Sequence, residues 1–171
     1  MNDLQTQLYE VIYSIATSFE FDRSYKNSSV RYGFLNYIAR FGLADEKYFV
    51  SPSARDVILG KTNASGEYLI RSFKKRCSDI VYEHVVPCKV VADLIMLNRA
   101  SRDHIKYVLI KCGIVCIVTR EEDNILRKCY KSTMPSNWDF ENGTPFARYH
   151  SALTIKNKSF STIKMKGVLV R

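Results

Sequence analysis

An acidic residue and a histidine stand side by side near the middle of the chain, in the stretch Asp79-Ile-Val-Tyr-Glu83-His84-Val-Val-Pro87. A carboxylate is a hard oxygen ligand for a divalent cation, and a neutral imidazole can take a proton from a water molecule. Glu83 and His84 could therefore supply a metal ligand and a general base from one strand end. The structural alternative is that His84 is a packed, hydrogen-bonded residue in an apolar surrounding.

A second group of candidate ligands opens a helix further along the chain. The β-branched run 114–119 predicts a buried strand, and the Thr-Arg-Glu-Glu sequence at its end is a capping box. The helix that follows begins with Glu121, Glu122, Asp123 and Asn124. Acidic residues in a first turn ordinarily complement the positive end of the helix dipole. Here they could also supply oxygen ligands to a cation.

The order of these features resembles the ββα-metal, or HNH-type, nucleases. In that family a first strand provides an acid and a histidine, a second strand returns beside it, and the next helix provides further metal ligands. The resemblance implies that His84 is the general base and that Glu83 is the strand-borne metal ligand. The helix-borne ligand would be Asp123, with Asn124 or Glu122 as substitutes.

The resemblance extends over about residues 79–130 and departs from the family pattern in two places. The segment between the strands, about residues 88–113, is longer and more helical than the short loop usual in the family. Asn98 is only a candidate for the asparagine that orients the histidine. The helix also lacks the further histidine often found there, and an all-oxygen site favours a magnesium or manganese cofactor over zinc.

The chain is basic, with 26 Lys and Arg against 17 Asp and Glu and a formal net charge of +9. Such an excess favours a polyanionic partner, first of all nucleic acid, although it can also serve solubility alone. Lys74, Lys75 and Arg76 precede the acid-histidine segment, and Arg148 lies in an aromatic and basic string. We expect these four residues to hold a nucleic-acid backbone. The alternative is an ordinary solvated helix end or helix edge.

Apolar periodicity predicts a mostly helical chain. Three-and-four spacing predicts helices at about 4–19 and 30–41, with Gly42 just past the end of the second. Ser51 and Pro52 predict the start of a short helix. Further helices are expected at about 67–76, after Pro87, after Ser101 and at 120–130.

Five cysteines, an odd number without a C-x-x-C pair, indicate neither a disulfide framework nor a zinc ribbon. They are typical of reduced thiols in a cytoplasmic protein. The first residues show no secretory signal, and no apolar run approaches the roughly 20 residues of a membrane span. We therefore expect a cytoplasmic location and no membrane partner.

These patterns predict an α+β fold, a mostly helical single domain over residues 1–171 with a small central ββα unit at 79–130. A helical part at 1–60 precedes this unit. A loop and a basic tail at 131–171 follow it, and the tail is a candidate strand, hairpin or basic arm.

The function expected from the resemblance is a metal-dependent endonuclease, a hydrolase that cleaves phosphodiester bonds of DNA or RNA. One alternative is a non-enzymatic nucleic-acid-binding or regulatory protein, in which Glu83 and His84 are structural. Another is a protein-interaction module of phage or mobile-element type, indicated by the many Tyr and Phe residues among Lys and Arg. A protein partner is therefore possible as well as nucleic acid.

Overall fold

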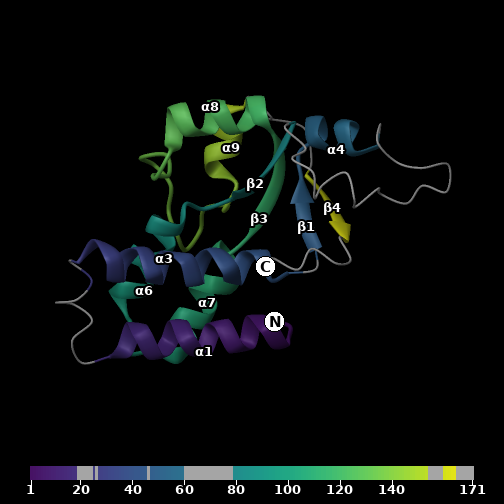
Figure 1. Cartoon of the computed structure of the whole chain (residues 1–171). Helices are drawn as coiled ribbons and strands as arrows, with labels where there is room; N and C mark the ends of the chain where they lie inside the picture. Colours follow the sequence, from purple (N-terminus) through teal and green to yellow (C-terminus); the bar gives the residue numbers. More distant parts are fainter. Residues whose placement is uncertain (19–24, 26, 46, 60–78, 154–159, 165–171) are drawn as a thin grey trace.

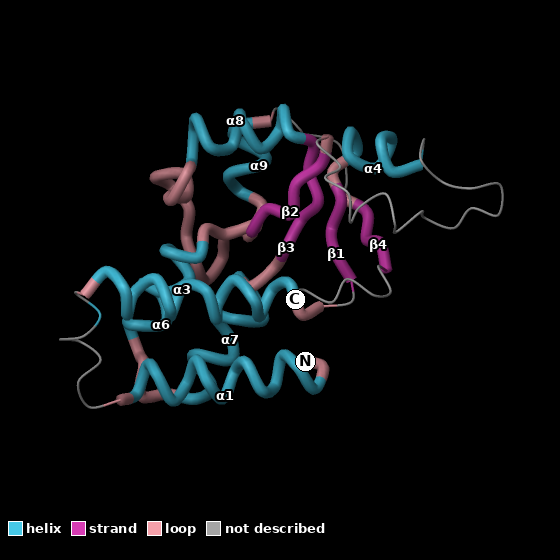
Figure 2. The backbone as a smooth tube through the Cα atoms, in the orientation of Figure 1, coloured by secondary structure: helices cyan, strands magenta, loops and turns pink. Residues whose placement is uncertain are grey.

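A small mixed β-sheet lies between two groups of helices (Figure 1). The computed structural model describes residues 1–18, 25, 27–45, 47–59, 79–153 and 160–164. Helices predominate among these residues (Figure 2). The fold is thus the mostly helical α+β fold that the sequence predicts.

The helices are α1 (Asp3–Thr17), α3 (Ser28–Leu43), α4 (Pro52–Leu59), α6 (Cys88–Leu97), α7 (Arg102–Cys112), α8 (Arg120–Tyr130) and α9 (Ala147–Ala152). The strands are β1 (Lys47–Val50), β2 (Ile80–His84), β3 (Val115–Thr119) and β4 (Ser161–Lys164). In the described part of the chain the strand order is β2-β3-β1-β4. Strand β3 is antiparallel to β2 and parallel to β1, and β4 is antiparallel to β1.

Helices α1, α3, α6 and α7 form a helical layer beside the sheet (Figure 1). Their apolar stripes face one another and bury a common core that includes Ile12, Phe34, Ile38, Ile95 and Leu109. A capping box between Asn2 and Gln5 starts α1. Val86, just after β2, belongs to the same core, so the helical layer is joined to the sheet at the end of this strand.

The two faces of the sheet have different covers. On one face, Cys116 and Val118 of β3 pack with Leu126 of α8 and Tyr149 of α9. On the opposite face, Ile117 of β3 belongs to the core that includes residues of α4. Alternation of side chains along each strand produces this division.

The predicted ββα unit is present as a topology. Strands β2 and β3 are antiparallel neighbours, and α8 follows β3 directly and packs on both strands. Helices α6 and α7 are the long helical insertion expected between the strands. The sequence therefore predicts the order and pairing of these elements correctly.

Two details of the N-terminal part differ from the prediction. The part at 1–60 was expected to be helical, but it contains strand β1. This strand is stabilised by pairing with β3 and β4, which lie far along the chain, so no local pattern in residues 1–60 indicates it. Helix α3 also continues through Gly42, which was expected to follow its end. A Cβ atom at Gly42 would lie 2.7 Å from the Gly113 carbonyl oxygen, so the glycine permits a close approach of two backbones. The helix expected at 67–76 lies outside the described residues.

Candidate functional site

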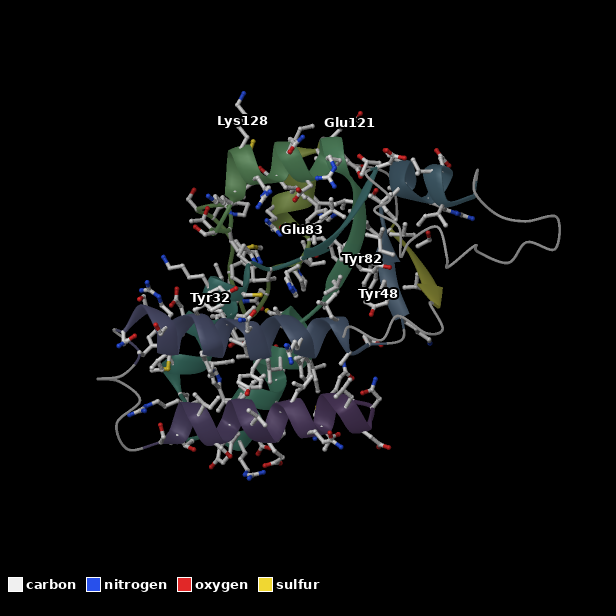
Figure 3. All side chains as sticks on the ribbon, in the orientation of Figure 1. Tyr32, Tyr48, Tyr82, Glu83, Glu121 and Lys128 are labelled. Carbon is white, nitrogen blue, oxygen red and sulfur yellow. The ribbon has the colours of Figure 1, made fainter. Side chains whose placement is uncertain are left out.

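Glu83 and His84 belong to the last two positions of β2 and point to opposite faces of the sheet. Successive side chains of a strand alternate between its two faces. Val81 lies on the α8 side, whereas Tyr82 packs edge-on against Tyr48 on the other side, with ring centroids 5.4 Å apart. Figure 3 shows Glu83 beneath α8 and Tyr82 beside Tyr48. Glu83 therefore faces α8 and α9, and His84 faces away from them.

Arg148 of α9 is the partner of Glu83. Its Nη2 atom lies 2.6 Å from Glu83 Oε1, and the arginine side chain is completely buried. The same guanidinium donates hydrogen bonds to the backbone oxygens of His84, of Val85 at 2.9 Å and of Tyr130 at 3.1 Å. One arginine thus connects the end of β2, the loop after it, the end of α8 and α9.

The predicted role of Arg148 in holding a nucleic-acid backbone is therefore wrong. A buried arginine with its donors already bonded to protein oxygens cannot reach a phosphate. Its planar fork of donors is suited to several fixed acceptors at once. The four oxygens around it would be costly to bury without these hydrogen bonds.

His84 is partly buried on the other face, and its environment disfavours a positive charge. Burial, and next the nearby Arg148 guanidinium, lower the pKa of the His84 imidazole to about 4. The ring is therefore neutral near pH 7, as a general base must be. The carboxylate of Glu83, however, lies on the opposite side of the strand, so the two groups do not form one centre.

Asp123 lies at the far end of the β2–β3 pair from Glu83. Thr119, which precedes α8, pairs with Ile80 at the start of β2, whereas His84 pairs with Val115. Four residues of strand separate these two ends by about 13 Å. Asp123 is itself buried in the first turn of α8, and its Oδ2 atom lies 3.8 Å from Arg127 Nη1.

The structure therefore does not bring the predicted metal ligands together. Asn124 is exposed on the outside of α8. Within the described residues, no group of three or more His, Cys, Asp and Glu side chains could hold a metal ion. The oxygens of Glu83 and Asp123 each have a basic partner instead.

Glu122, considered above as a substitute ligand, caps the helix. Its carboxylate accepts a hydrogen bond from the Thr119 backbone N–H at 2.8 Å, and the Thr119 hydroxyl accepts one from the Glu122 N–H. The same Oε2 atom accepts a hydrogen bond from the Ser51 hydroxyl at 2.5 Å. Ser51 also accepts a hydrogen bond from Ala54 N–H as the N-terminal residue before α4. Glu122 thus joins the starts of two helices.

Sequence reasoning missed the pairing of Glu83 with Arg148 and the contact of Glu122 with Ser51. The aromatic neighbours of Arg148 in the sequence were a signal that this segment is buried. A buried arginine is stable when its guanidinium is fully hydrogen-bonded. The cationic residues Lys74, Lys75 and Arg76 lie outside the described residues.

Comparisons of the chain with protein-family models, with curated proteins and with solved structures find no match.

Proposed function

We propose that the chain is a non-enzymatic nucleic-acid-binding protein in which Glu83 and His84 are structural. The observation that carries the structural role of Glu83 is its internal ion pair with Arg148, and the net charge of +9 supports the nucleic-acid ligand. This pair gives the acid of the candidate centre a role in joining β2 to α9. The net positive charge of the chain is then the feature that indicates a ligand.

The charge supports a polyanionic ligand. The formal net charge is +9, and each phosphate neutralised by a Lys or Arg releases bound counterions. Segment 60–78 alone contains Lys61, Arg71, Lys74, Lys75 and Arg76 against the single acid Glu67. We infer that Lys74, Lys75 and Arg76 take part in binding.

A metal-dependent nuclease is less well supported by the geometry, since Glu83, His84 and Asp123 do not converge. It remains the competing hypothesis for the same experiments. Free cysteines among the described residues, Cys88, Cys112, Cys116 and Cys129, are consistent with the proposed cytoplasmic location. None of the described helices has the length and apolar character needed to cross a membrane.

The decisive test measures binding and cleavage on the same samples. Binding is measured by fluorescence anisotropy with labelled duplex DNA, single-stranded DNA and RNA. The logarithm of the binding constant should fall linearly with the logarithm of the salt concentration. Incubation with plasmid DNA and magnesium or manganese should give no cleavage beyond that of a protein-free sample. His84→Ala should then bind as the parent does, with His150→Ala as the matched histidine control.

Two results would reject this function. The absence of salt-dependent binding to all three nucleic acids would remove the proposed activity. Metal-dependent cleavage that is lost in His84→Ala and kept in His150→Ala would favour the nuclease. A protein captured after nuclease treatment, in the absence of nucleic-acid binding, would favour an interaction module.

A further inference from the structure

A row of cationic side chains follows the outer surface of α8. Arg120, Arg127 and Lys131 recur at helical spacing, and all three are exposed. Residues three, four or seven apart lie on the same face of a helix. Exposed Lys128 lies beside the row, and exposed Asn124 lies within it. We call these five residues the α8 row.

Helix α8 lies at the surface of the protein. Its buried residues are Glu122, Asp123 and Leu126, whereas most of its other side chains are exposed. In Figure 1 α8 lies at the outer edge of the molecule, with α9 and the sheet on its inner side. In Figure 3 the side chains of Lys128 and Glu121 point away from the sheet. More than half of the circumference of the helix is therefore accessible to a ligand.

The charges of α8 are separated between its faces. The acids Glu122 and Asp123 point inward, so Glu121 is the exposed acid of the helix. The guanidinium of Arg127 contacts Asp123 only at 3.8 Å, and its side chain remains 63% exposed. Cations in a last turn ordinarily complement the helix dipole. Arg120 is exposed at the first position of the helix, seven residues before Arg127, so the row follows the whole length of α8 and is not confined to its last turn.

We propose that α8 binds double-stranded DNA by lying in its major groove, with Arg127, Lys128 and Lys131 on the phosphates. This inference rests on the proposed function and names its ligand and its surface. The positive row complements the charge of the DNA backbone. It contains no aromatic residue, which a platform for stacking unpaired bases would use.

The shape of α8 favours duplex DNA over duplex RNA. A helix with its side chains is about 10–12 Å across, close to the roughly 12 Å width of the B-DNA major groove. The major groove of A-form RNA is too deep and narrow for such an approach. Asn124 lies in the middle of the row, and an asparagine amide can pair with the N6 and N7 positions of adenine.

The test compares two triple variants with the same loss of charge. One replaces three cations of the α8 row (Arg127→Gln, Lys128→Gln and Lys131→Gln), and glutamine keeps a helix propensity similar to that of Lys and Arg. The control replaces exposed lysines on other elements (Lys47→Gln, Lys89→Gln and Lys106→Gln). Circular dichroism first checks that both variants fold as the parent does.

Anisotropy with a duplex DNA of about 20 base pairs is then measured over a salt series. We expect the row variant to bind at least about tenfold more weakly than the parent. The slope of the logarithm of the binding constant against the logarithm of the salt concentration should also become smaller by about 2–3, since each lost phosphate contact contributes about 0.9. The control variant should change the affinity by less than about threefold. Single-stranded DNA and duplex RNA of the same sequence should bind less tightly than duplex DNA.

The outcomes separate this inference from the proposed function. If the parent binds nucleic acid but the two variants lose affinity equally, or the row variant loses none, the α8 surface is wrong and the proposed function stands. Tighter binding of duplex RNA or single strands would overturn the assignment to duplex DNA. If the parent binds none of the three ligands, the proposed function fails and this inference fails with it.

Discussion

Two glutamates lie on the inner side of α8, one at each end of the helix, and the protein stabilises their charges in different ways. Glu122, in the first turn of the helix, accepts hydrogen bonds from a serine hydroxyl and a backbone N–H. Glu83 lies near the last turn and pairs with the guanidinium of Arg148. The first carboxylate has neutral hydrogen-bond donors, and the second has a full positive charge.

The helix dipole explains the difference. The start of a helix presents unpaired N–H groups and a partial positive charge, which stabilise a carboxylate. The end presents carbonyl oxygens and a partial negative charge. Arg148 donates to the Tyr130 carbonyl as well as to Glu83, so one cation offsets both. An acid at the end of a helix needs a charged partner that an acid at its start does not.

The largest expected effect is therefore at Glu83. Glu83→Gln should lower the free energy of unfolding by about 3–5 kcal/mol, because Arg148 would remain buried with its charge uncompensated. Urea denaturation monitored by circular dichroism measures this change. A loss below about 1 kcal/mol would contradict the description of the pair as a structural connection.

A double-mutant cycle checks that the loss comes from the ion pair. Arg148→Met alone should be at least as damaging as Glu83→Gln, since it also leaves the carbonyls of Val85 and Tyr130 without a donor. The double variant should cost less than the sum of the two single variants. Simple additivity would mean that the two side chains act independently.

The second expected effect concerns pH and the residue next to Glu83. The pKa of His84 is lowered to about 4, first by burial and then by Arg148. An unfolded histidine titrates near 6.5, so the unfolded chain binds the proton more readily between these values. The stability contributed by neutral His84 should be complete above pH 6.5 and should fall as the pH drops toward 4, by about 2–3 kcal/mol.

This prediction is measured as the difference in unfolding free energy between the parent and His84→Gln from pH 7.5 to 4. Glutamine does not titrate, so the parent should lose stability relative to the variant as the solution becomes more acidic. His150→Gln, at an exposed histidine, controls for general effects of acid. A difference that stays constant with pH would mean that His84 protonates freely in the folded protein.

The same contrast between the glutamates shows what the sequence could predict. The capping box of Glu122 is a local pattern within four residues, and the helix, its start and its cap were all predicted correctly. Most other helix starts, including those after Ser51 and Ser101, also follow from local signals. The ββα order follows from the periodicity of its segments.

The partner of Glu83 could not be found in the same way, because Arg148 is separated from it by 65 residues. No local sequence pattern identifies which of the Lys and Arg residues pairs with Glu83. Strand alternation, in contrast, was available from the sequence. Glu83 and His84 are neighbours in a strand, so their opposite orientations follow from the strand geometry. The alternation of side chains along β2 therefore already argued against a single centre made of Glu83 and His84.

The smallest expected effect completes the comparison. Glu122→Gln is the same substitution as at Glu83, but glutamine also serves as the third residue of a capping box. Its side-chain oxygen can still accept from Thr119 N–H and from the Ser51 hydroxyl, and no buried cation loses its partner. We expect a loss of about 1 kcal/mol or less in urea denaturation, compared with about 3–5 kcal/mol for Glu83→Gln. If the two variants lose equal stability, the charge of Glu122 is as necessary as that of Glu83, and the dipole does not distinguish the two ends of α8.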